Sequence, residues 1–188
     1  MIWLIAGLIL FLGVHSMRIV APGFRDRMIA ARGENAWKGI YSVVALAGLL
    51  LIIWGYGQAR PDAAFLYEPP VFMRHIVSSL MLIAMILLVA AYVPDGHIKK
   101  RVKHPMLTAV KVWAFAHILA NGDLATLILA GSFLAWAVVD RISLKRRGDP
   151  EFGAVSLRGD VIAVVVGTAI TIWFILQLHA FLFGVSPI

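Results

Sequence analysis

Apolar residues form six long stretches along the chain, and short polar or basic segments separate them. A helix rises about 1.5 Å per residue, so roughly 20 mostly apolar residues cross the about 30 Å hydrocarbon core of a bilayer. The pattern therefore predicts an all-α fold, a polytopic transmembrane helix bundle with six spans. The stretches that meet or approach the required length are about 2–20, 37–57, 71–93, 105–120, 124–141 and 160–184.

The fourth and fifth stretches are short, and only Asn121-Gly122-Asp123 separates them. These three residues are typical of a tight turn. A single long span would leave their polar groups near the middle of the bilayer without water to hydrogen-bond them. We therefore expect a tight antiparallel helical hairpin at the outer membrane boundary, with Asp123 capping the start of the fifth helix.

Basic residues gather in or beside the first, third and fifth connections. The second connection holds Arg60 against Asp62 and Glu68, and the fourth has no basic residue. Cytoplasmic loops are the ones that carry excess Lys and Arg, so both termini are predicted to face the outer, periplasmic side. Fourteen of the 17 Lys and Arg residues belong to the three basic connections: Arg18, Arg25, Arg27, Arg32, Lys38, Lys99, Lys100, Arg101, Lys103, Arg141, Lys145, Arg146, Arg147 and Arg158.

Composition supports a membrane protein and narrows the chemistry. The chain of 188 residues is 61% hydrophobic and 14% charged, whereas soluble domains have about 45–50% apolar and about 25% charged residues. The lipid bilayer is the expected partner, and the net charge of +7 is explained by loops beside anionic headgroups rather than by nucleic acid. The absence of cysteine excludes disulfides, thiolate metal sites and thiol nucleophiles. Without a repeat or a second composition class, residues 1–188 are expected to form one domain.

Polar side chains inside the spans are the candidates for function, because placing them in hydrocarbon costs several kcal/mol. His15 and Arg18 are three residues apart and therefore share a helical face. Arg74 and Lys111 lie near span ends and are expected to reach headgroups. The full set is His15, Arg18, Arg74, His75, Lys111, His117, Asn121, Asp123, Gln177 and His179.

A stripe of small and flat residues surrounds His117. Trp113, Ala114, Asn121 and Leu124 lie at i−4, i−3, i+4 and i+7 from it. A flat macrocycle fits such a stripe, with Ala114 allowing close approach, and a histidine that hydrogen-bonds a neighbouring helix fits it equally well. His104, which precedes Pro105, is expected to be an entry-turn residue of its helix.

The spacing of the ligand-type residues excludes most metal sites. The chain has no H-E-x-x-H motif, no H-x-x-H pair and no carboxylate cluster within a span. In an apolar helix bundle without thiols, haem held by two histidines from different helices is the natural cofactor.

In two groups of residues the chain resembles the NnrU family, which comprises bacterial membrane proteins linked to nitric oxide metabolism in denitrifiers. One is His15-Ser16 in the first span. The other runs from His104 to Asp123. The resemblance covers about residues 2–147, and its second group comprises Lys103-His104-Pro105, Leu107, Trp113, Ala116-His117 and Ala120-Asn121-Gly122-Asp123. The same superfamily includes the 15-cis-ζ-carotene isomerase, which carries haem b on two histidines.

The resemblance implies a multi-pass protein of the bacterial inner membrane that binds haem b iron through His15 and His117. Trp113, Ala114 and Asn121 would then line the cofactor, and Arg18 would pair with a propionate or act as an anchor. The isomerase has a cysteine one turn before its second ligand, where this chain has Ala114, so a thiolate switch is excluded.

Helix depth leaves a second ligand pair open. His15 and His117 would differ by about 10 Å in depth at about 1.5 Å per residue, and helix tilt would have to absorb this. His75 is therefore the reserve ligand and His179 a weaker one. Four functions remain: a redox or nitric-oxide-related haem protein with a membrane redox partner, a haem-dependent isomerase of a polyene or another hydrophobic isoprenoid, a transporter or accessory protein without cofactor, and a lipid-modifying methyltransferase. The last is the least favoured, because the chain has no convincing cytosolic site for a nucleotide-like methyl donor.

Overall fold

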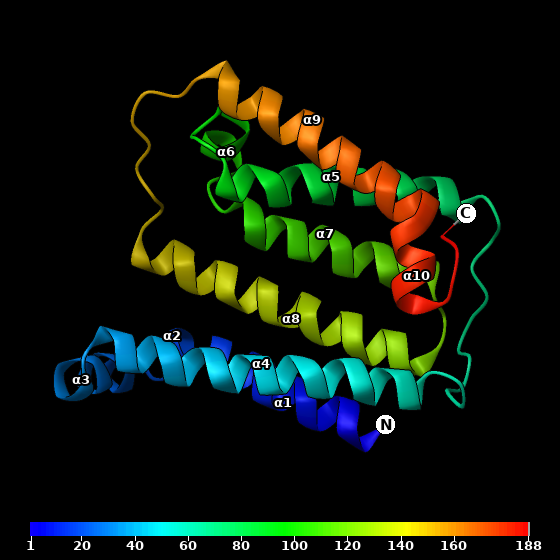
Figure 1. Ribbon diagram of the computed structural model, residues 1–188, viewed down its shortest axis with the longest axis horizontal. Coiled ribbons are helices and arrows are strands. Elements are labelled where there is room, and N and C mark those ends of the chain that lie inside the picture. Colours follow the sequence, from blue (N-terminus) through cyan, green and yellow to red (C-terminus); the bar gives the residue numbers. More distant parts are fainter. Residues whose placement is uncertain (188) are drawn as a thin grey trace. The chain divides into compact units, whose positions relative to one another are not determined.

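The computed structural model describes residues 1–187, and helices account for the secondary structure of this part of the chain (Figure 1). An isolated antiparallel bridge between Phe65 and Asp123 is the strand-like pairing it contains. The predicted all-α class is confirmed. The elements are α1 (Ile2–His15), α2 (Met17–Val20), α3 (Pro22–Arg32), α4 (Glu34–Ala59), α5 (Met73–Tyr92), α6 (His97–Val102), α7 (Pro105–Ala120), α8 (Leu124–Arg147), α9 (Leu157–Trp173), the π-helical η1 (Phe174–Leu178) and α10 (His179–Phe183).

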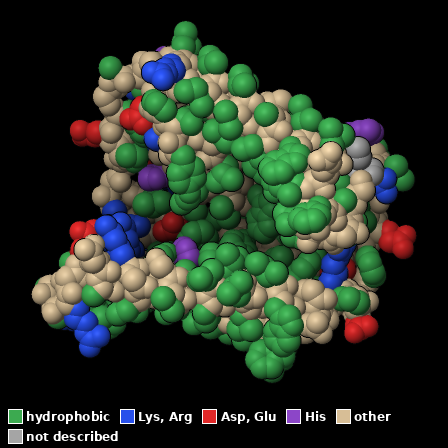
Figure 2. All heavy atoms as spheres, in the orientation of Figure 1, with side chains coloured by type: hydrophobic (Ala, Val, Ile, Leu, Met, Phe, Trp, Pro, Cys, Tyr) green, Lys and Arg blue, Asp and Glu red, His purple; other side chains and the backbone are tan. Residues whose placement is uncertain are grey.

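Four helical segments are long and apolar enough to cross a membrane within the described residues: Glu34–Ala59, Met73–Tyr92, Leu124–Arg147 and Leu157–Phe183. Two further apolar helices, α1 and α7, have 14 and 16 residues. Large hydrophobic side chains stay exposed along these helices, as the green surface in Figure 2 shows. Exposed apolar side chains on apolar helices indicate a membrane-embedded protein.

The helix boundaries differ from the sequence expectation in the connections. The first stretch breaks at Ser16, which separates α1 from α2. The Ser16 hydroxyl donates to the Leu12 carbonyl at 2.7 Å. Two short helices, α3 and α6, also occupy the basic first and third connections. The density of charged residues favours loops in these two connections. Local backbone hydrogen bonds nevertheless allow α3 and α6 to form, with Pro22 in the first turn of α3.

The chain forms two compact units, and the first comprises residues 1–67 and 122–143. In this unit α1 packs along α4 (Figure 1). A Cβ added at Gly7 would lie 2.6 Å from the Ile52 nitrogen, and one at Gly48 would lie 2.7 Å from the Phe11 nitrogen. Because glycine has no side chain, the two backbones approach closely, as small residues permit in membrane helices.

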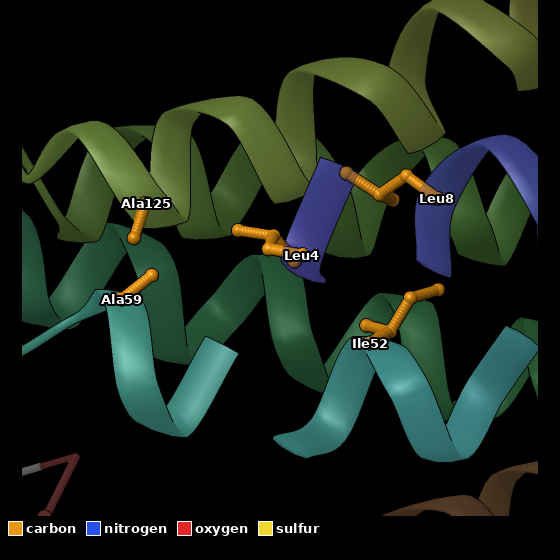
Figure 3. Close-up of a cluster of buried hydrophobic side chains, with 5 residues drawn as sticks. All are labelled: Leu4, Leu8, Ile52, Ala59 and Ala125. Carbon is orange, nitrogen blue, oxygen red and sulfur yellow. The ribbon is translucent and has the colours of Figure 1, made fainter. Parts of the chain in front are cut away.

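The core of the first unit joins three helices. Leu4 and Leu8 come from α1, Ile52 and Ala59 from α4, and Ala125 from α8 (Figure 3). Each of these side chains is at most 5% exposed. This core places α8 against α1 and α4, and so brings the later part of α8 to the end of α1 that carries His15.

The turn between α7 and α8 has the predicted break. Asn121 ends α7 in an extended conformation, and Asp123 Oδ1 accepts the Thr126 backbone N–H at 2.8 Å. The expectation that Asp123 caps the start of α8 is confirmed. In the first unit the Leu66 N–H donates to the Gly122 carbonyl at 2.8 Å, and the Leu124 N–H donates to the Ala64 carbonyl at 2.9 Å.

The second unit comprises residues 68–121 and those from 144 onward. Here α5 packs against both α7 and α9 (Figure 1). A Cβ added at Gly167 of α9 would lie 2.7 Å from the Ile86 Cα, so a glycine permits the α5–α9 approach.

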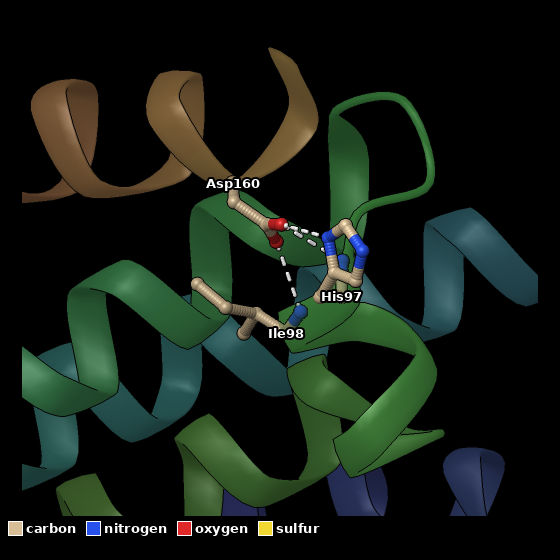
Figure 4. A network of polar contacts seen from close by, with 3 residues as sticks. All are labelled: His97, Ile98 and Asp160. Carbon is tan, nitrogen blue, oxygen red and sulfur yellow. Dashed lines mark hydrogen bonds and ion pairs between the residues drawn. The ribbon is translucent and has the colours of Figure 1, made fainter. Parts of the chain in front are cut away.

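A carboxylate from α9 caps the short basic helix α6 in this unit (Figure 4). Asp160 Oδ2 accepts the His97 N–H at 2.9 Å, and Oδ1 accepts the Ile98 N–H at 2.9 Å. The His97 imidazole also lies against the carboxylate, with Nδ1 2.8 Å from Oδ2. Two of the free N–H groups in the first turn of α6 are therefore satisfied by a residue more than 60 positions later in the chain.

Candidate functional site

His15 ends α1 within a group of aromatic rings. Its ring centroid lies 4.2 Å from that of Phe11, 5.3 Å from that of Tyr41 and 6.0 Å from that of Trp136. Phe11 belongs to the same helix, whereas Tyr41 comes from α4 and Trp136 from α8. The imidazole is thus enclosed on several sides by flat, largely apolar groups.

The hydrogen bond of His15 determines which ring nitrogen is available. Nδ1 lies 2.7 Å from the Phe11 carbonyl oxygen. A carbonyl oxygen only accepts, so Nδ1 carries the proton, and in the neutral ring Nε2 keeps its lone pair. Histidines that bind metals are commonly oriented in this way, with the other ring nitrogen donating to a backbone carbonyl.

His117 repeats this arrangement on α7. Its Nδ1 lies 2.9 Å from the Trp113 carbonyl oxygen, and the two rings are 4.8 Å apart at 42°. The Asn121 side-chain amide donates to the His117 carbonyl at 3.2 Å, and Ala114 is fully buried. The structure therefore brings together the predicted stripe of Trp113, Ala114, His117 and Asn121.

The stripe ends one residue after the helix. Leu124, expected at i+7 on the same face, belongs instead to α8. The reason is local: α7 ends at Ala120, and the extended Asn121 breaks the helical periodicity on which the expectation depended.

Arg18 lies near His15, as its spacing predicts, although Ser16 separates their helices. Both residues line a cavity of about 240 Å³ in the first unit. We call this the basic cavity. Its lining consists of Val14, His15, Met17, Arg18, Arg25, Trp37, Lys38, Tyr41 and Ser42.

Several of the residues around His15 are not predictable from its spacing in the sequence. Tyr41 and Trp136 come from distant helices, and Arg25 reaches the cavity from α3. Trp136 Nε1 is buried and has no hydrogen-bond partner within residues 1–187. An unpaired buried donor costs free energy, so it marks a place where a ligand would satisfy a polar group. An intramembrane Trp was the available signal, but it does not indicate which histidine it faces.

The other histidines have different surroundings. His75 is exposed in the first turn of α5. His179 Nδ1 lies 2.7 Å from the Val185 carbonyl oxygen, so it too leaves Nε2 available. His104 is the N-cap residue of α7, as expected, and its buried Nε2 lies 3.5 Å from Asp149 Oδ1 without a hydrogen bond.

Within the part of the chain that the structure describes, no three His, Asp or Glu side chains gather in a group able to hold a metal ion. A haem held by two axial imidazoles does not require such a group. His15 belongs to the first unit, and His117, His75 and His179 belong to the second. The donor chemistry of His15 and of His117 fits an axial ligand, because each ring leaves Nε2 free.

Comparison with known proteins places the chain in a family. Neither a curated protein nor a solved structure matches it. The sequence model described as NnrU protein matches residues 3–187, which is nearly the whole chain and includes both histidine environments. This extent of match means that the protein, a helical membrane protein by its fold, belongs to the NnrU family.

Proposed function

We propose that this NnrU-family protein is a membrane haem b protein with His15 and His117 as the axial ligands. The observation that carries the proposal is the shared geometry of the two imidazoles. In each, Nδ1 donates to the carbonyl four residues earlier, at 2.7 Å from Phe11 and 2.9 Å from Trp113. Both rings are thereby held in the tautomer whose Nε2 would be free to bind iron.

The proposal assigns roles to the neighbouring residues. Trp113 and Ala114 provide a flat and small surface beside His117, and Asn121 donates to the His117 carbonyl. Arg18, which lines the same cavity as His15, is proposed to neutralise a propionate. In the bound state the haem supplies one-electron redox chemistry. Because two imidazoles would hold the iron, electron transfer with a membrane redox partner is the proposed activity, in nitric oxide or denitrification metabolism.

Membrane placement is part of the same proposal. We propose that α1 and α7 join the four longer segments, giving six spans in the bacterial inner membrane with both termini on the periplasmic face. The basic residues of α2, α3, α6 and the α8–α9 connection then share the cytoplasmic side. A bilayer that is locally thinner accommodates the 14-residue α1 and the 16-residue α7.

The test is an absorbance spectrum of the protein expressed with a haem supply and purified in detergent. We expect a Soret band and the low-spin spectrum of two imidazole ligands in the wild type. His15→Ala and His117→Ala should each lose haem or become five-coordinate. His104→Ala and His97→Ala are matched controls, because neither residue belongs to the proposed ligand set, and both should keep the wild-type spectrum.

Two outcomes would contradict the proposal. A wild-type protein that stays colourless despite a haem supply would exclude the cofactor. A coloured protein in which neither His15→Ala nor His117→Ala changes haem content or spectrum would exclude this ligand pair. Circular dichroism of each variant distinguishes loss of haem from loss of helical structure.

A further inference from the structure

We propose that the basic cavity binds the headgroup of an anionic phospholipid. The cavity lies wholly within the first unit, where α1, α2, α3 and the first turns of α4 meet. This assignment is independent of the haem proposal, although His15 and Arg18, which that proposal also uses, both line the cavity. The charge, the aromatic residues and the size of the cavity support it.

The charge of the lining has one sign. Arg18, Arg25 and Lys38 line the cavity, and no acidic residue does. Arg25 pairs with Asp26 at 3.2 Å, and Lys38 pairs with Glu34 at 2.9 Å. Both carboxylates lie outside the lining. Arginine binds phosphate oxygens through a planar fork of N–H donors, so this set favours a phosphodiester.

Arg18 differs from Arg25 and Lys38 because, among the described residues, no ion pair competes with a ligand for its guanidinium. Within residues 1–187 no carboxylate lies within ion-pair distance of its guanidinium. The Ser42 side chain also lines the cavity, and its hydroxyl is suited to a headgroup glycerol.

Aromatic residues on this side of the unit suit a membrane–water boundary. Trp37 and Tyr41 line the cavity, with ring centroids 6.3 Å apart, and Phe24 of α3 lies 6.3 Å from Trp37. Trp and Tyr are enriched at headgroup level in membrane proteins. A short helix with basic residues and an apolar side chain toward its neighbours, as α3 has, is typical of the interface.

The size of the cavity fits a headgroup rather than a whole lipid or macrocycle. Its volume of about 240 Å³ is below the roughly 300–1,000 Å³ of pockets that enclose drug-sized ligands. Val14 and Met17 add apolar wall, which suits the glycerol backbone at the start of the acyl chains. A free phosphate ion would leave that apolar wall uncovered, so the lipid is the favoured source of the phosphate.

The experiment measures lipid retention by native mass spectrometry of the full-length protein. Detergent-solubilised protein is titrated with phosphatidylglycerol, with phosphatidylcholine and with inorganic phosphate. We expect one phosphatidylglycerol to bind in preference to phosphatidylcholine, and millimolar phosphate not to displace it. Arg25→Gln is the test variant, because Arg18 also belongs to the proposed haem site.

Arg27→Gln is the matched control, since it removes the same charge from the same helix but does not line the cavity. Each basic residue near an anionic surface contributes roughly 1 kcal/mol, so Arg25→Gln should weaken phosphatidylglycerol binding about fivefold. Arg27→Gln should bind it as the wild type does. The haem spectrum, recorded on the same samples, should be unchanged in both variants.

Several results would overturn the assignment. Equal retention of both lipids, or equal losses in Arg25→Gln and Arg27→Gln, would reduce the cavity to part of a diffuse basic surface. Displacement of the lipid by phosphate would make free phosphate the ligand. If Arg25→Gln lowered haem content and left lipid binding intact, the cavity would belong to the haem carboxylates. A colourless protein that still selects phosphatidylglycerol would contradict only the haem proposal.

Discussion

The hydroxyl of Tyr56 on α4 lies 2.7 Å from the hydroxyl of Thr126 on α8. Thr126 Oγ1 is also 2.7 Å from Asp123 Oδ2. The carboxylate accepts the Thr126 proton, so Thr126 accepts in turn from Tyr56. These two hydrogen bonds connect the cap of α8 to α4 within the first unit.

Tyr56→Phe removes the donor of this chain and leaves the Thr126–Asp123 bond in place. We expect a loss of about 0.6 kcal/mol, and at most about 1.7 kcal/mol, in the free energy of unfolding, as measured for hydrogen bonds between membrane helices. Thermal unfolding in detergent provides the measurement. Tyr92→Phe is the control, because the exposed Tyr92 hydroxyl donates to a weak sulfur acceptor, Met106, at 3.4 Å. Equal effects of the two substitutions would argue against a specific α4–α8 link.

Asp123→Ala leaves the Thr126 N–H without its acceptor and removes the partner of the Thr126 hydroxyl. Loss of a helix cap typically costs about 0.5–2 kcal/mol, and because Asp123 is 2% exposed we expect the upper half of that range. Asp123→Asn should restore most of the stability, since asparagine is an equally good cap. Chemical denaturation compares the three proteins. An Asn variant as unstable as the Ala variant would show that the charge matters rather than the cap.

His75→Ala separates the two ligand pairs that the sequence leaves open. If His15 and His117 hold the iron, the spectrum of His75→Ala should match that of the wild type, because the exposed His75 then binds nothing. If His75 and His117 hold it, His75→Ala should lose the low-spin bands and His15→Ala should keep them. Absorbance spectra of the two variants, recorded at equal haem supply, decide between the pairs.

The proposed topology has both termini in the periplasm, because retention of basic loops on the cytoplasmic side dominates orientation. Reporters fused after the C-terminal Ile188, a position outside the described residues, should be active only if they function in the periplasm. Fusions within the basic α8–α9 connection, for example after Gly153, should show the opposite activity. A C-terminal fusion active only in the cytoplasm would contradict the six-span arrangement.

Local sequence determined most of the helical framework. Hydropathy along stretches of about 20 residues predicts helices wherever backbone groups must be satisfied without water. The break at Asn121-Gly122-Asp123 and the cap by Asp123 followed from residues that are neighbours in the chain. The Trp113–His117–Asn121 stripe was equally predictable, because helical spacing alone places these residues on one face. Charged residues in the first and third connections, however, favoured loops where the structure has α3 and α6.

Tertiary structure decided what surrounds each of these residues. Tyr41 and Trp136 reach His15 because α4 and α8 pack on α1. The close approach of α1 and α4 depends on glycines, and the sequence around a glycine does not indicate which helix it contacts. Asp160 caps α6 from more than 60 residues away, and α3 completes the basic cavity. Periodicity assigns a residue to a face of its own helix. Which helix lies opposite that face depends on packing between distant segments, which sequence spacing does not encode.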